Sequence, residues 1–341
     1  MRVARLRRSD VNGPGIRRAR SGRGFRYLDA SGRPVTDPGE KERLRRLVIP
    51  PAWRDVWICP WPNGHLQAVG TDAAGRRQYL YHPRFREQQE AAKHDHVLEV
   101  AAVLPEVRAH VAADLAGRGL TRTRVLACAV RLLDLGFFRV GNEAYRRDNG
   151  TYGLTTLLKE HASCRGGEVC LTYPAKYSKT QTRAVVNPHA CTVLRSLLRR
   201  RGGGDHLFAY WEGGAWHDVH AEELNDYLRT RAGADITAKD FRTWHATVLA
   251  AVALAVSARI ADESKAARKR AVVRAVREVS EYLGNTPAVC RASYINPRVI
   301  ELFEEGRTVA ADLDRLGDGA VFGRPATQGA VEEAVLRLLS S

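Results

Sequence analysis

The stretch Leu283-Gly-Asn-Thr-Pro-Ala-Val-Cys-Arg-Ala-Ser-Tyr-Ile-Asn-Pro297 comes at the end of the segment that has the most regular helical pattern in this sequence of 341 residues. Residues 262–283 predict a helix with one apolar face and cations outside it, and Gly284 is a typical residue for ending such a helix. The apolar face consists of Val272, Val276, Val279 and Leu283. We therefore expect an amphipathic helix followed by a turn that leads to a tyrosine.

Tyr294, nine residues beyond the Gly-Asn turn, is a candidate nucleophile. A tyrosine hydroxyl ordinarily has a pKa of about 10, so it needs neighbouring cations to react near neutral pH. The alternative is a half-buried packing residue in front of Ile-Asn-Pro. The choice between the two depends on whether other segments supply those cations.

The segment Lys239-Asp-Phe-Arg-Thr-Trp-His245 opens a predicted helix over residues 239–258. Cations at a helix N-terminus oppose the helix macrodipole, whereas a bound phosphate is favoured there. Lys239 and Arg242 therefore indicate an anionic ligand. The alternative is a pair of surface cations beside a buried Phe and Trp.

The segment Leu135-Gly-Phe-Phe-Arg-Val-Gly-Asn-Glu-Ala-Tyr145 ends a predicted helix over residues 121–136. Arg139 follows two phenylalanines and precedes Val-Gly, so we expect it to be partly enclosed, where its planar fork could grip a phosphate. The alternative is a structural arginine paired with Glu143 or with a helix carboxylate.

Residues 169–186 predict a β-hairpin that carries Lys176 and Lys179 near its turn. A lysine on a turn can reach into a groove and donate a proton to a leaving group. The alternative is that both lysines are simply solvated.

The charge distribution indicates a polyanionic partner. The chain has 54 Lys and Arg against 38 Asp and Glu, a formal net charge of +16. Residues 1–93 carry 20 cations and 9 anions, whereas residues 94–341 carry 34 and 29, so the N-terminal part holds most of the excess. Each phosphate that such a surface neutralises releases counterions from a nucleic acid. Only 8 of the cations are lysines, so a catalytic lysine has few candidates.

The composition argues against several other classes. With 44% apolar and 27% charged residues the chain is globular and not disordered. The longest nearly apolar run, residues 246–258, is too short to span a bilayer, and the basic N-terminus lacks the apolar segment of a secretory signal. The six cysteines form no CxxC pair, so we expect reduced thiols in a cytoplasmic protein and no zinc site.

Nucleotide and metal motifs are missing from the sequence. It has no Walker loop, no GxGxxG and no carboxylate cluster suited to Mg²⁺. Phosphate chemistry would therefore depend on cationic side chains and a protein nucleophile, with no cofactor, metal or nucleotide.

Local patterns predict an α+β fold of two domains. Residues 1–21 lack periodicity and predict a basic flexible arm, and residues 22–88 predict a small antiparallel β-rich domain with a short helix over 38–47. Residues 89–310 predict a larger helical domain that contains the hairpin, and residues 311–341 predict a tail that could hold a short helix over 329–339. The predicted helices cover residues 84–102, 105–117, 121–136, 190–201, 220–231, 239–258, 262–283 and 297–305.

Taken together, the four cationic or tyrosine-bearing segments strongly resemble the type IB DNA topoisomerases in their compact bacterial and poxvirus form. The matching words are Phe-Arg-Val-Gly-Asn-Glu with Thr151-Tyr-Gly-Leu-Thr-Thr, Lys-Asp-Phe-Arg-Thr-Trp, and Leu-Gly-Asn-Thr-Pro-Ala-Val-Cys-Arg-Ala-Ser-Tyr-Ile. The resemblance runs from about Arg17 to about Glu305. It implies a β-sheet cap domain followed by the helical catalytic fold that these enzymes share with tyrosine recombinases.

The resemblance also implies a set of catalytic residues, carried over by motif. They are Arg139, Lys176, Arg242, Asn285 and Tyr294. Many relatives have His at the position of Asn285, and Asn can donate a hydrogen bond but cannot titrate near neutral pH. The family hairpin usually has Gly before its lysine, whereas this chain has Pro174-Ala, so Lys179 remains the reserve for Lys176.

The implied DNA contacts come from both domains. Gly75-Arg-Arg-Gln-Tyr-Leu-Tyr-His82 is similar to a family strand that lies against duplex DNA, and the alternative is an exposed aromatic strand face. The implied contacts are Gln78, Tyr79 and Tyr81 in this strand, Tyr145 at a phosphate, and Lys239 at the backbone.

The function implied by the resemblance is relaxation of supercoiled duplex DNA through a 3′-phosphotyrosyl intermediate, without ATP or metal. We expect a monomer that clamps DNA, is not bound to a membrane, and works in the cytoplasm at the nucleoid. One alternative is a tyrosine recombinase, which usually has a His two or three residues before the second arginine and a helical N-terminal domain. The other is a non-catalytic architectural DNA-binding protein.

Overall fold

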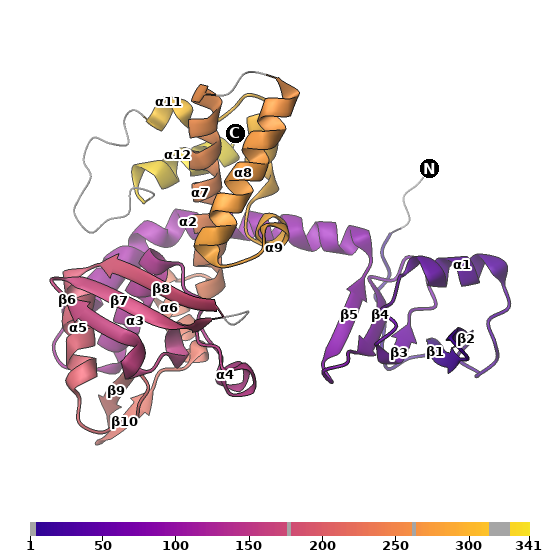
Figure 1. Cartoon of the computed structure of the whole chain (residues 1–341), viewed down its shortest axis with the longest axis horizontal. Coiled ribbons are helices and arrows are strands. Elements are labelled where there is room, and N and C mark those ends of the chain that lie inside the picture. The colour runs from indigo at the N-terminus through magenta and orange to yellow at the C-terminus, as the bar shows by residue number, and fades with distance from the viewer. Residues whose placement is uncertain (1–4, 176–178, 261–263, 314–327) are drawn as a thin grey trace. The chain divides into compact units, whose positions relative to one another are not determined.

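The computed structural model describes residues 5–175, 179–260, 264–313 and 328–341 (Figure 1). The chain divides into two compact units, residues 1–93 and residues 94–341. The domain boundary predicted at residue 88 lies a few residues before this division, inside the helix α2 (Pro83–Leu115). The antiparallel sheet followed by a helical domain confirms the predicted fold class.

The first unit is a five-stranded antiparallel sheet in the order β2-β1-β3-β4-β5, with helix α1 (Pro38–Arg46). The strands are β1 Ile16–Ser21, β2 Gly24–Leu28, β3 Arg54–Ile58, β4 Leu66–Thr71 and β5 Arg77–Tyr81. Asp37 caps α1 by accepting a hydrogen bond from the Glu40 N–H, and Pro38 occupies its first turn. Leu44 of α1 packs with Ile58 and Ala68 in the small core of this unit.

The prediction of a flexible arm over residues 1–21 is wrong for its last part, because residues 16–21 form β1, which pairs with both β2 and β3. Arg18 donates hydrogen bonds to the carbonyls of Ile49, Pro50 and Trp53. This arginine of the predicted arm therefore satisfies the carbonyls of a loop in the folded unit. Strand β2 pairs with β1, and Leu28 at its end makes one isolated antiparallel bridge to Pro34.

Helix α2 runs without a break through Pro105, whereas the sequence predicted two helices separated before this proline. Proline lacks the N–H that would close one intrahelical bond, so the helix needs support from packing. Leu104 and Val107 on either side of it are fully buried in the core of the second unit. This burial accounts for the continuity that local propensity argues against.

The second unit packs helices around α7 (Ala238–Ile260) and carries two small sheets. The other helices are α3 Arg122–Gly136, α4 Glu143–Asn149, α5 Pro188–Arg199, α6 Ala221–Ala232, α8 Lys265–Leu283, α9 Pro287–Ser293, α10 Pro297–Glu304, α11 Ala310–Leu313 and α12 Ala330–Leu339. The strands β6 Ala162–Arg165, β7 Glu168–Ala175 and β8 Lys179–Val186 form one sheet, and β9 Ala209–Glu212 and β10 Ala215–Asp218 form the other. Two short 3-10 turns, Leu154–Thr156 and Lys159–His161, precede β6.

Helix α7 is the central helix of this unit and contacts α3, α6, α8, α10, α11 and α12. Residues 238–258 have a mean hydropathy of 1.3, enough by composition to cross a bilayer, but 72% of this window is buried inside the fold. The apolar run therefore belongs to a core helix that is covered by its neighbours (Figure 1).

Residues 330–339, part of the predicted tail, pack on the core of the second unit. The predicted short helix is α12, and its residues Val331, Ala334, Val335 and Leu339 join the main core. The sequence did not predict the short helices α4 and α9 or the strands β6, β9 and β10. Each of these is seven residues or shorter, which leaves little periodicity to detect.

Candidate active site

Arg139 is positioned by an abrupt end of helix α3. Phe137 caps the helix in the left-handed conformation, with φ 58° and ψ 28°, and Phe138 is buried beneath it. The next residues are held by backbone hydrogen bonds, since the Leu154 N–H donates to the Arg139 carbonyl at 2.8 Å. The Arg139 guanidinium donates to the Gly284 carbonyl at 2.9 Å and to Oδ1 of Asn285 at 2.5 Å.

Arg242 lies near the start of α7 and is only 4% exposed. Its two terminal nitrogens donate to the carbonyls of Phe137 and Leu283, and its Nε has no hydrogen-bond partner among the described residues. Burial lowers the pKa of the Arg242 guanidinium, Tyr294 partly opposes this effect, and Arg139 adds to it. A buried cation with a free donor is suited to an anionic ligand.

Asn285 follows the left-handed cap Gly284, whose φ of 62° ends α8. The Asn285 N–H donates to the Ser280 carbonyl at 2.9 Å, which completes the turn. Its Oδ1 accepts from Arg139, and its buried Nδ2 has no partner in the part of the chain that the structure describes. This amide can therefore donate to a bound oxygen.

Tyr294 is the half-buried C-terminal cap of α9. Its N–H donates to the Cys290 carbonyl at 3.0 Å, and its own carbonyl accepts from the Thr247 hydroxyl at 3.3 Å. The Arg242 guanidinium carbon lies 5.3 Å from the centre of the Tyr294 ring. The backbone of the tyrosine is thus fixed to α7, and its ring lies beside Arg242. Pro297, three residues further along the chain, begins α10.

A cavity of about 240 Å³ lies where the end of α3, the start of α7, the end of α8 and the β7–β8 hairpin meet, and Tyr294 is not among its lining residues. Its lining includes Arg139, Arg242 and Asn285. Tyr173, Gln181 and Arg183 of β7 and β8 also line it, although no motif in the sequence marked them as site residues. Strand periodicity was the available signal, because Tyr173 pairs with Gln181 and residues two apart share a face of the hairpin.

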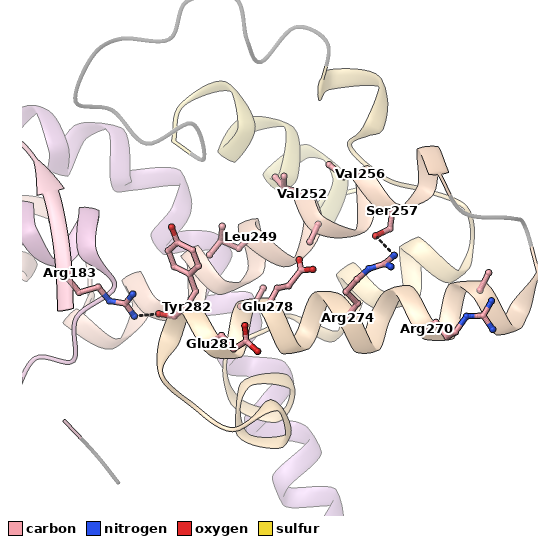
Figure 2. Close-up of a pocket in the computed structure, with 13 residues that line it drawn as sticks. Arg183, Leu249, Val252, Val256, Ser257, Arg270, Arg274, Glu278, Glu281 and Tyr282 are labelled. Carbon is pink, nitrogen blue, oxygen red and sulfur yellow. Dashed lines mark hydrogen bonds between the residues drawn. The ribbon is translucent and has the colours of Figure 1, made fainter. Parts of the chain in front are cut away.

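The hairpin is tied to α8 by Arg183, which donates a hydrogen bond to the Tyr282 carbonyl (Figure 2). Lys176 lies outside the described residues, although Ala175 just before it lines the cavity. Lys179 begins β8 and pairs with Ala175 through the backbone. The choice between the two lysines therefore stays a prediction.

A larger groove of about 950 Å³ lies between α7 and α8 (Figure 2). Leu249, Val252 and Val256 contribute apolar side chains to it, and its rim has both arginines and glutamates. None of the predicted catalytic residues that the structure describes lines this groove. The smaller cavity is the better candidate active site because the free, buried donors belong to it.

In the first unit, Tyr79 and Tyr81 share the exposed face of the edge strand β5, with their rings stacked at 6.2 Å. Their side chains are 49% and 38% exposed. Gln78 lies on the opposite face and donates to Asp72 at 2.9 Å. The structure therefore brings the two tyrosines together but not Gln78.

The remaining two predicted DNA contacts lie in the second unit. Tyr145 of α4 is 39% exposed and lines a cavity of about 220 Å³ that also includes Arg139. Lys239 is exposed in the first turn of α7, three residues before Arg242. No group of three or more His, Cys, Asp or Glu side chains suited to a metal occurs among the described residues.

Residues 82–312 match the family described as eukaryotic DNA topoisomerase I, catalytic core, and residues 24–72 match the family described as bacterial DNA topoisomerase IB, N-terminal domain. The first match covers more than half of the chain. The chain therefore belongs to the type IB DNA topoisomerase family. It is an isomerase that acts on duplex DNA.

Curated relatives agree with this assignment over most of the chain. The DNA topoisomerase 1B of Acanthamoeba polyphaga mimivirus is 28% identical over 296 residues, covering 85% of this chain and 88% of the relative. The DNA topoisomerase I of Monkeypox virus and the DNA topoisomerase 1B of Vaccinia virus (strain Copenhagen) are each 21% identical over 278 residues, covering 80% of this chain and 85% of the relative.

Among solved structures, the XerH site-specific recombinase bound to a palindromic difH substrate has a TM-score of 0.36 and 15% identity to this chain. The match covers 62% of this chain and about half of the other, 51%.

Proposed function

We propose that this topoisomerase relaxes supercoiled duplex DNA by cutting one strand with Tyr294 and then rejoining it, without ATP or a metal ion. The hydroxyl oxygen of Tyr294 bonds to phosphorus and loses its proton to solvent. The bond from phosphorus to O5′ breaks, and Lys176 donates a proton to O5′. The covalent 3′-phosphotyrosyl bond retains the energy of the phosphodiester, so the reverse step restores the strand after the DNA has rotated.

Arg139, Arg242 and Asn285 stabilise the charge that develops on the non-bridging oxygens in this proposal. The observation that carries it is the convergence of two arginines and an amide on one cavity, where the second arginine, Arg242, also lies beside the Tyr294 ring. The Nε of Arg242 and the Nδ2 of Asn285 are buried donors without a partner among the described residues. Donors that are already fixed and unsatisfied are the arrangement that favours a developing oxyanion.

The test is relaxation of a supercoiled plasmid in EDTA without ATP. We expect stepwise relaxation by the native chain and none by Tyr294→Phe, because that variant lacks the attacking oxygen. Absence of relaxation by a well-folded native chain would refute the proposal. A plasmid without paired recombination sites is used, so that a site-specific recombinase would give no product.

The assignment of the general acid needs a second substrate. A duplex with a 5′-phosphorothiolate at the cleavage site provides a leaving group that requires no proton. We expect Lys176→Ala to cleave this duplex at the native rate and the ordinary duplex slowly. If Lys179→Ala is rescued instead, the reserve lysine is the acid.

The proposal includes DNA contacts from both units of a single chain. Tyr79 and Tyr81 offer stacked, exposed rings. In the second unit, Tyr145 lines a cavity together with Arg139, and Lys239 precedes Arg242 by three residues in α7. We also propose a monomer in the cytoplasm, associated with the nucleoid. The six cysteines, all free, support a reducing compartment. Sedimentation with and without DNA and cell fractionation test these points.

A further inference from the structure

A network of buried charged and polar side chains connects the C-terminal helix α12 to the base of the candidate active site. Arg108 of α2 donates to Asp134 of α3 at 2.9 Å and to Glu332 of α12 at 2.5 and 2.9 Å. His245 of α7 lies with Nε2 3.1 Å from Oδ1 of Asp134, and the Trp244 indole donates to Glu332 at 2.8 Å. Asp134, His245 and Glu332 are each less than a tenth exposed.

His245 also contacts the residue whose carbonyl holds Arg242. Its ring meets the Phe137 ring edge-on, with centres 5.0 Å apart and an angle of 65°. Phe137 has the left-handed φ of 58°, which is unfavourable for a residue with a Cβ, and its carbonyl accepts from Arg242. Since Arg139 is only two residues further along, the conformation of Phe137 affects the placement of both arginines.

Glu332 belongs to a segment beyond residues 82–312, the part that matches the catalytic-core family. Its carboxylate is the acceptor for two N–H groups of Arg108 and for the indole of Trp244. When a buried donor loses its acceptor, the fold is destabilised by the full cost of desolvating that donor. Helix α12 therefore supplies the acceptor for two side chains, Arg108 and Trp244, that lie within the part of the chain matching the catalytic core.

We propose that His245 and Glu332 are positioning residues for DNA cleavage. Asp134 orients His245, the imidazole of His245 supports the left-handed conformation of Phe137, and the Phe137 carbonyl orients Arg242. Glu332 holds Arg108 and Trp244, which flank these residues, in place. Neither residue touches the reacting atoms. The inference rests on the role proposed for Arg242 in cleavage.

The chemistry of the network favours orientation over stability as its main effect. A buried ion pair often adds little net stability compared with apolar side chains of similar volume, because desolvation offsets the attraction. It does hold directional groups in one arrangement. A small misplacement of a catalytic group can slow a reaction on the order of 100-fold, so orientation can be measured as a rate.

Three variants separate the contributions of the two residues. His245→Gln can keep a donor to Asp134 but loses the ring on Phe137, whereas His245→Phe keeps a ring but loses the donor. Glu332→Gln keeps the shape of the side chain but loses the charge. The matched control is Glu223→Gln on α6, because Glu223 likewise accepts from an arginine and from an aromatic side chain, Arg122 and Tyr210.

The measurements are the single-turnover rate of cleavage at saturating enzyme, the affinity for uncleaved duplex, and the melting temperature of each variant. We expect His245→Gln, His245→Phe and Glu332→Gln to slow cleavage on the order of 10-fold or more while affinity changes little. We expect the control Glu223→Gln to keep the native rate. Lower melting temperatures with native rates of the folded enzyme would overturn the proposal, because that is the pattern of a merely structural network.

The decisive test repeats each variant in an Arg242→Lys background. If the two residues act through Arg242, their effect on the rate shrinks when Arg242 is already replaced, which a double-mutant cycle measures as coupling. An equal fold-loss in both backgrounds would overturn the inference and leave the role of Arg242 intact. If Arg242→Lys by itself cleaves at the native rate, the role proposed for Arg242 fails as well, so the two failures are distinguishable.

Discussion

Arg139 donates a hydrogen bond of 2.5 Å to Oδ1 of Asn285, and this bond joins the end of α3 to the turn that follows α8. Oδ1 accepts this bond, and the amide's donor, Nδ2, is buried and has no partner among the described residues, so it can donate to a ligand. The pair therefore combines a cation and an oriented neutral donor. This arrangement suits the oxygens of a phosphodiester.

We expect Asn285→Ala to slow DNA cleavage on the order of 10- to 100-fold, since one donor to the transition state is lost. Asn285→Asp should be slower still, because it places a second negative charge where the phosphate binds. Single-turnover cleavage of a short duplex measures both. Asn285→His is the control, since neutral imidazole can still donate, and its rate should gain a pH dependence near 6.5. Equal rates for the native, Ala and Asp enzymes would contradict this role.

Gly153 is expected to be intolerant of even a methyl group. A Cβ at this position would lie 2.5 Å from the backbone of Gly141 and 2.8 Å from the Arg139 carbonyl. Backbone atoms cannot rotate away, so Gly153→Ala should lower the free energy of unfolding by about 1–3 kcal/mol and slow cleavage by displacing Arg139. Thermal unfolding and single-turnover cleavage measure these effects. Gly24→Ala, which has room for a methyl group, is the control and should be nearly neutral.

The two faces of β5 predict different effects of mutation. Tyr79→Ala and Tyr81→Ala should each weaken binding to duplex DNA, because both rings are exposed and stack on one another. Gln78→Ala should affect binding less, since its amide binds Asp72 on the other face. Duplex affinity at two salt concentrations is the measurement, and a larger loss for Gln78→Ala than for either tyrosine variant would show that the strand presents its other face.

The environment of the Asp134 carboxyl predicts how the free energy of unfolding depends on pH. Burial alone would raise the pKa of this carboxyl, but Arg108 and His245 lower it well below its ordinary value. A group with a lowered pKa in the folded state stabilises the fold above its unfolded pKa of about 3.9, and this stability is lost as the pH falls below about 4. We expect Asp134→Asn to be less stable at pH 7 and to lose less stability on acidification. Urea unfolding at pH 7 and at pH 3 tests this, and parallel losses in both proteins would contradict it.

The sequence predicted the antiparallel β-rich character of the first unit, most long helices, and the hairpin before α5, because these elements have clear periodicity. It failed where distant packing prevails over local preference. Pro105 lies inside α2 because Leu104 and Val107 are buried, and the arginines near Ile16 belong to β1 because two strands pair with it. The alternation of side chains along a strand would have placed Gln78 correctly, on the face opposite the two tyrosines.

Local sequence motifs were sufficient to predict the family and the candidate residues Arg139, Arg242, Asn285 and Tyr294, because their chemistry depends on residue type and chain order. Only the tertiary structure showed that Arg139 and Asn285 bind each other, that Arg242 is held by two carbonyls, and that α12 reaches Trp244 through Glu332. The reason is physical. Hydrogen bonds and burial depend on distances between segments as far as 224 residues apart in the chain, and no local pattern encodes those distances.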